Sequence, residues 1–77
     1  MPRGVFNWTF HDIVEFLREH NFNLNHTEGS HHFYTGVYDG KFRQASVPFH
    51  GSKAINPRTL NSIIRQSGIA RKEWLSW

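Results

Sequence analysis

The chain contains no cysteine, and this absence excludes both disulfide bonds and thiolate ligands for a metal ion. It also contains no apolar run approaching the roughly 20 residues that cross a bilayer, and no signal-peptide pattern at its start. Its 77 residues are enough for one small hydrophobic core, so we expect a single domain over residues 1–77. Together these absences favour a soluble protein of the reducing cytoplasm, without a membrane partner.

Acidic residues are scarce in the second half of the chain. Residues 1–40 hold two basic and five acidic side chains, whereas residues 41–77 hold seven basic side chains and one acidic side chain. A basic half of this kind suits a polyanionic partner that is bound with release of counterions, and it equally suits a solvated surface without a partner. Charge therefore permits a nucleic-acid function without establishing it.

The first half of the chain is expected to form a short arm over residues 1–8, one helix and two strands. Thr9 is the expected N-cap, because the apolar residues after it repeat at helical spacing: Phe10, Ile13, Val14 and Leu17. This helix is expected to end near His20 or Asn21. The alternation of apolar and polar residues then predicts strands over about residues 22–27 and 30–38.

The second half is expected to begin with the hairpin turn Asp39-Gly40 and a third strand over residues 41–49, with Pro48 at a sheet edge. Asn56-Pro57 predicts the start of a second helix, and Gly68 its end. A further turn over residues 71–75 would dock Trp74 and Leu75 onto the core. The fold class is therefore α+β, in the order α-β-β-β-α, with two helices on one face of a three-stranded antiparallel sheet.

One short tract is better suited to chemistry than any other part of the chain: Gly29-Ser30-His31-His32-Phe33-Tyr34. A Gly-Ser turn precedes strand-forming aromatic residues, and side chains on a strand alternate between its two faces. One imidazole can therefore be open to solvent while its neighbour packs. An imidazole held rigidly and titrating near neutral pH is well suited to moving a proton.

This tract, together with two later stretches, resembles the HicA family of toxin ribonucleases. The resemblance covers residues 9–75 and depends on the Gly-Ser-His tract after a helix that ends at Asn21-Phe22, on the strand end Val47-Pro48-Phe49-His50, and on the helix pattern of residues 56–69. It implies a fold similar to double-stranded-RNA-binding domains. It also implies cleavage of messenger RNA without metal or cofactor, inhibition of translation, and neutralisation by a HicB-like antitoxin.

The resemblance also implies which residues act. The family's active-site histidine maps onto His31, with His32 as second choice. The residues expected to contact RNA are Gly29, Ser30, Lys41, Arg43, His50, Lys53 and Arg58. His50 is a candidate for a second proton carrier or a phosphate contact, although loop histidines are usually neither.

The chain departs from the family's pattern at two positions. Asn21 stands where a glycine is usual, and Glu28 stands where a lysine or arginine often precedes the Gly-Ser pair. A carboxylate at that position repels phosphate, so either the substrate approaches differently or activity is reduced. The cluster of Lys41, Arg43 and Lys53 is the candidate to take over the positive role.

Other functions compete with RNA cleavage on the residues alone. His31 could be a strand histidine with only a structural hydrogen bond, since titratable groups are often structural. A non-catalytic RNA-binding module of the same fold would use the same basic half, and an inactive interaction module would need no RNA affinity. The spacing of His11, His20 and His26 matches no zinc signature, so no metal site is expected.

Overall fold

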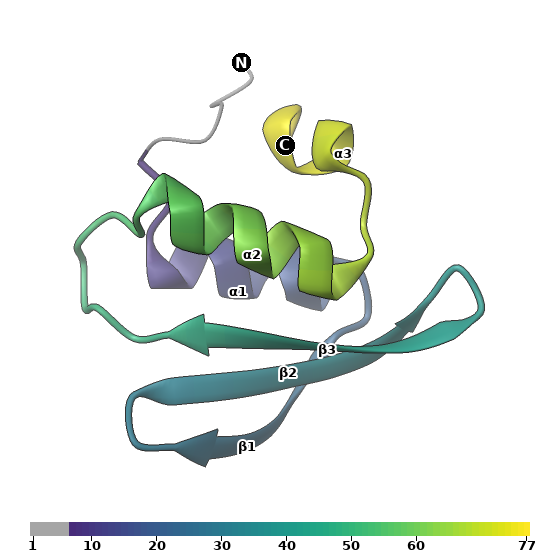
Figure 1. Ribbon diagram of the computed structural model, residues 1–77, viewed down its shortest axis with the longest axis horizontal. Helices are drawn as coiled ribbons and strands as arrows, with labels where there is room; N and C mark the ends of the chain where they lie inside the picture. Colours follow the sequence, from purple (N-terminus) through teal and green to yellow (C-terminus); the bar gives the residue numbers. More distant parts are fainter. Residues whose placement is uncertain (1–6) are drawn as a thin grey trace.

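The computed structural model describes residues 7–77 (Figure 1). Its helices and strands follow the predicted order, and the α+β fold with a three-stranded antiparallel sheet is confirmed. The bounds are α1 Phe10–Glu19, β1 Asn23–Glu28, β2 His31–Tyr38, β3 Lys41–Pro48, α2 Pro57–Ser67 and α3 Arg71–Leu75. Most of the expected arm over residues 1–8 lies outside the described residues, and Trp8, which that arm included, is fully buried in the core.

Helix α1 begins as predicted. The Thr9 hydroxyl accepts a hydrogen bond from the Asp12 amide at 3.3 Å, and the Asp12 carboxylate accepts one from the Thr9 amide at 3.0 Å, which closes a capping box. The buried stripe differs from the predicted one in two positions. Phe16 is fully buried, whereas Val14 is only half-buried at the margin of the core.

The sheet order is β1-β2-β3, so β3 lies at an edge, as Pro48 predicted. Asp39 and Gly40 both have positive φ, at 56° and 77°, which is the geometry of the tightest hairpin turns. From this turn β2 and β3 pair continuously up to His31 opposite Pro48. β1 starts at Asn23, one residue later than predicted, because the Phe22 amide still donates a hydrogen bond to the Leu17 carbonyl of α1, at 2.9 Å.

Both long helices lie on the same side of the sheet, as Figure 1 shows. Side chains on that side are buried, namely Tyr34, Ala45 and Val47, whereas Val37 and Phe42 on the other side are 63% and 70% exposed. Burial raises the pKa of the Tyr34 hydroxyl, although the nearby Arg18 charge partly offsets this effect. The second face of the sheet is therefore open over the described residues.

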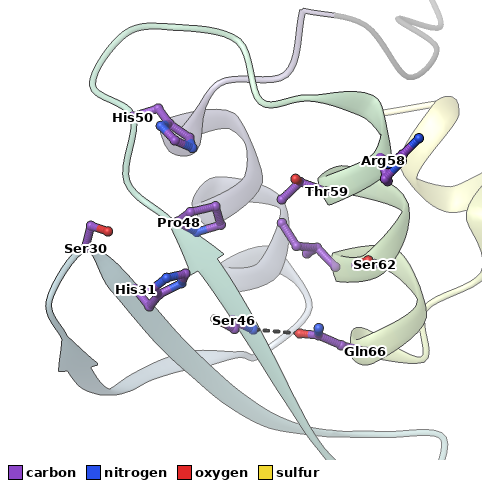
Figure 2. Close-up of a pocket in the computed structure, with 10 residues that line it drawn as sticks. Ser30, His31, Ser46, Pro48, His50, Arg58, Thr59, Ser62 and Gln66 are labelled. Atoms are coloured by element: carbon purple, nitrogen blue, oxygen red, sulfur yellow. Dashed lines mark hydrogen bonds between the residues drawn. The ribbon is translucent and has the colours of Figure 1, made fainter.

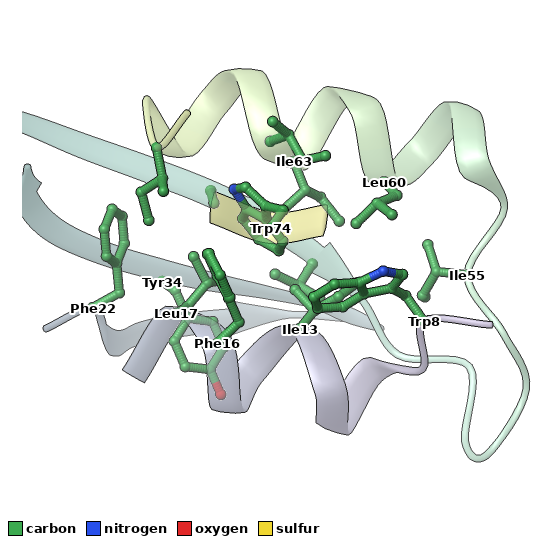
Figure 3. Close-up of a cluster of buried hydrophobic side chains, with 14 of the residues drawn as sticks. Trp8, Ile13, Phe16, Leu17, Phe22, Tyr34, Ile55, Leu60, Ile63 and Trp74 are labelled. Carbon is green, nitrogen blue, oxygen red and sulfur yellow. The ribbon is translucent and has the colours of Figure 1, made fainter. Parts of the chain in front are cut away.

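An aromatic cluster joins α1 to the C-terminal turn (Figure 3). The Trp74 ring stacks on Phe16, with ring centroids 3.9 Å apart, and is fully buried, whereas Leu75 is half-buried. Trp8 stacks on Trp77 at 5.5 Å. Aromatic pairs bury much area per residue, which suits so short a chain. No helix in residues 7–77 is long and apolar enough to span a membrane.

Candidate active site

A groove of about 480 Å³ lies between the edge strand β3 and helix α2 (Figure 2). The start of β2, the last part of β3, the loop after it and one side of α2 contribute its lining: Ser30, His31, Ser46, Pro48, His50, Arg58, Thr59, Ser62, Ile63 and Gln66. Seven of these ten side chains carry a hydroxyl, amide or imidazole group, and apolar surface lies between these groups. The groove therefore offers both hydrogen bonds and apolar contacts to a ligand.

His31 reaches the groove because of the turn that precedes it. Gly29 adopts a left-handed conformation, with φ of 59°. A Cβ added to this residue would meet no heavy atom within 4 Å. The glycine is therefore required by backbone conformation rather than by lack of space. His31 is the first residue of β2 and stands opposite Pro48 of β3. Its side chain is exposed, on the open side of the sheet.

His32 points to the other side of the sheet. Its half-buried ring packs edge-to-face against Phe10, with centroids 4.9 Å apart, and lies 6.0 Å from the Phe49 ring. It does not line the groove. The alternation predicted for this tract therefore separates the two histidines, one in the groove and one against α1.

His50 enters the same groove from the loop after β3. The Phe49 amide donates a hydrogen bond to the Ser30 carbonyl at 2.8 Å, which extends the pairing of β2 and β3 by one residue beyond Pro48. His50 follows directly and is exposed. The backbone thus brings together two predicted site residues that are 19 positions apart in the sequence.

Helix α2 forms the opposite wall. The Asn56 side chain accepts a hydrogen bond from the Arg58 amide at 2.8 Å and so starts the helix where the sequence predicted. In the last turn of α2, the Gln66 side-chain oxygen accepts a hydrogen bond from the Ser46 amide of β3, also at 2.8 Å (Figure 2). This bond fixes α2 beside the strand and closes one end of the groove.

Six lining residues were not among the predicted site residues: Ser46, Pro48, Thr59, Ser62, Ile63 and Gln66. A signal for three of them was present. Residues 59, 62 and 66 repeat at helical spacing beside the buried stripe of α2 and form a polar stripe of their own. Ser46 gave no comparable signal, because its role depends on the helix that packs against it.

The predicted positive charges are not all near His31. Arg58 lines the groove, and the Lys53 amide donates a hydrogen bond to the His50 carbonyl at 3.2 Å. Lys41 pairs with Tyr38 at the other end of the hairpin, seven residues from Pro48, or about 23 Å along the strand. The expectation that Lys41, Arg43 and Lys53 act as one cluster is therefore wrong.

Arg43 faces the C-terminus of α2 instead. A Cβ added to Gly68 would lie 2.5 Å from the Arg43 guanidinium carbon, so the two residues are in close contact. The Arg43 Nε atom is buried and has no hydrogen-bond partner within residues 7–77. Arg43 thus packs on the helix side of the sheet, and not in the groove.

Glu28 stands opposite His31 in the pairing of β1 and β2. Its carboxylate lies 3.1 Å from His26 Nε2, and the His26 ring stacks on Phe33 with centroids 4.5 Å apart. Both side chains are exposed, His26 less than Glu28. The carboxylate that departs from the family's pattern is therefore paired with an imidazole on the open face of the sheet.

No three histidine, aspartate or glutamate side chains of the described residues are grouped so that they could hold a metal ion. The His20 ring packs on Phe16 and its Nδ1 lies 2.8 Å from the Phe16 carbonyl oxygen. His20 is the C-cap residue of α1, and its ring packs at that end of the helix.

Comparison with protein families identifies a family for this chain. The family model described as "HicA toxin of bacterial toxin-antitoxin" matches residues 10–69 of the 77. The matched span runs from the start of α1 to just beyond the end of α2 and contains every residue of the groove. A comparison with curated proteins gives no match.

Proposed function

Because the chain belongs to the HicA family of toxins of bacterial toxin–antitoxin systems, we propose that it is an endoribonuclease that cleaves messenger RNA. One observation carries the proposal. An exposed imidazole, His31, follows a defined turn and lines a groove that Arg58 also lines. Cleavage of a phosphodiester uses a proton carrier and is helped by a positive charge that can reach the phosphate, and the groove has a side chain of each kind.

The proposed reaction uses the ribose 2′-hydroxyl as its nucleophile. That oxygen attacks the adjacent phosphorus, the bond to the 5′-oxygen breaks, and the products carry a 2′,3′-cyclic phosphate and a 5′-hydroxyl. His31 moves a proton in this reaction, and Arg58 stabilises the charge that develops on the phosphate oxygens. DNA lacks the 2′-hydroxyl and is inert.

The proposed partner is a HicB-like antitoxin that covers the groove. A protein that binds over His31 and Arg58 excludes RNA by occupying both, and acidic side chains on its surface complement the basic second half of the chain. Cleavage of messenger RNA in the cytoplasm inhibits translation when this partner is absent.

The test compares His31→Gln with His32→Gln. The two histidines are neighbours in the sequence, and each variant replaces an imidazole with an amide. Only His31 lines the groove, so only the first variant changes it. We expect His31→Gln to slow cleavage of a single-stranded RNA by about 10²–10⁴-fold and to abolish growth arrest on expression, because general acid–base catalysis contributes that much. His32→Gln should retain cleavage once circular dichroism shows that it is folded.

Three further outcomes decide between this proposal and its competitors. An RNA with one 2′-deoxyribose at the cleaved position should resist cleavage there. If the wild-type chain binds RNA but leaves it intact, it is an RNA-binding module. If it neither binds nor cleaves RNA at low salt, where phosphate contacts are strongest, it is an interaction module.

A further inference from the structure

We propose that His50 performs the second proton transfer of the cleavage, so that His31 and His50 act as an acid–base pair across one phosphodiester. This inference rests on the proposed function. It adds a second catalytic residue and divides the reaction between two side chains.

Four of the six histidines have other roles in the fold. His20 contacts the Phe16 carbonyl, His26 pairs with Glu28, and the rings of His11 and His32 pack against Phe10. Neither His31 nor His50 makes a side-chain hydrogen bond, an ion pair or an aromatic contact with the described residues. These two rings are also the two that line the groove.

The backbone fixes the spacing of the pair. His31 stands opposite Pro48, and the hydrogen bond from Phe49 to Ser30 continues the pairing towards His50. β3 ends at Pro48, so His50 lies just beyond the paired strands; continued sheet geometry would make it a diagonal neighbour of His31, about 7–8 Å away. Figure 2 shows both rings on the side of the groove opposite α2. In the proposed arrangement one phosphodiester spans the two rings.

Two imidazoles complete the proton balance of the reaction. One takes the proton of the 2′-hydroxyl as the bond from that oxygen to phosphorus forms. The other gives its proton to the 5′-oxygen as the bond from phosphorus to that oxygen breaks. Both rings are exposed, so water restores their starting protonation after each turnover. Arg58 also lines the groove; in Figure 2 its side chain points away from the two rings, so its guanidinium group has to turn towards the phosphate to stabilise it.

The experiment uses two RNA substrates and four variants of the full chain. The first RNA is ordinary, and the second carries sulfur in place of the bridging 5′-oxygen at the cleaved position. A thiolate leaves without receiving a proton, so the second substrate needs no general acid. The variants are His31→Gln, His50→Gln, the double variant, and His11→Gln as a matched control whose exposed imidazole lies outside the groove.

On ordinary RNA we expect each groove variant to lose about 10²–10⁴-fold in rate, and the control to lose less than about threefold. On the sulfur substrate, one of the two single variants should recover to within about tenfold of wild type while the other stays slow. The variant that recovers identifies the acid. The double variant should then match the single variant that stays slow.

Other outcomes overturn the inference. If His50→Gln is folded and cleaves ordinary RNA at the wild-type rate, His50 is not catalytic, while a slow His31→Gln still supports the proposed function. If both single variants are slow and the sulfur substrate rescues neither or both, the two histidines do not divide the proton transfers. If the wild-type chain cleaves neither substrate, the proposed function itself fails.

Discussion

Gly36 is the position where one added methyl group should disturb the core most directly. It lies in β2 on the helix side of the sheet, opposite Arg43. A Cβ built there would lie 2.9 Å from Cγ of Phe22 and 3.0 Å from the Asn21 carbonyl oxygen. Phe22 is fully buried and Asn21 contributes backbone, so neither neighbour can move aside freely. We therefore expect Gly36→Ala to destabilise the domain.

The magnitude follows from two opposing effects. Forcing extra volume into a packed core costs about 1–3 kcal/mol. Alanine recovers about 0.5–1 kcal/mol, because glycine in a strand loses more conformational entropy on folding. The net loss is about 1–2 kcal/mol in the free energy of unfolding. For a domain of 60–100 residues this lowers Tm by about 5–15 °C.

The assay is thermal and urea unfolding followed by circular dichroism. The matched control repeats the substitution in a Phe22→Leu background, where the smaller side chain leaves room beside the new methyl group. There Gly36→Ala should cost at least about 0.5 kcal/mol less, since contacting positions couple. The reasoning is refuted if Gly36→Ala leaves Tm unchanged or raises it, or if its cost is the same in both backgrounds.

Three further predictions concern stability alone. Thr9→Ala should lower the free energy of urea unfolding by about 1 kcal/mol, because it removes the capping box. The raised pKa of Tyr34 contributes stability that is lost as pH rises from 10.0 through the folded value, so Tyr34→Phe should flatten alkaline unfolding curves; parallel curves contradict this. Gly68→Ala and Gly40→Ala should each lower the free energy of unfolding by about 1–2 kcal/mol, because alanine is strained at positive φ; an unchanged Tm in either variant would contradict this.

Much of the fold was predictable from sequence because its signals are local. The Thr9 cap, the Asp39-Gly40 turn and the Gly68 stop each depend on a few adjacent residues, and the structure confirms all three. The exchange of Val14 for Phe16 in the buried stripe was not predictable in this way. It depends on Trp74, which packs on Phe16 from far along the chain.

The candidate site was predictable in part. The turn places His31 and His32 on opposite sides of the sheet, as strand alternation requires. The groove itself depends on the Ser46–Gln66 hydrogen bond, which joins residues 20 positions apart and has no local signal. Grouping Lys41 with Lys53 failed for a related reason. A strand that advances about 3.3 Å per residue carries nearby sequence positions to opposite ends of the sheet.

All three tryptophans of the chain gather in the aromatic cluster, with Trp8 5.5 Å from both Trp74 and Trp77, and none of them lines the groove. Intrinsic fluorescence will therefore follow the docking of α3 and the melting of the domain closely. It will be insensitive to a nucleotide that occupies the groove. Titrations of this protein with RNA need a fluorophore on the RNA, and a change in indole emission during such a titration would mean that the core itself has rearranged.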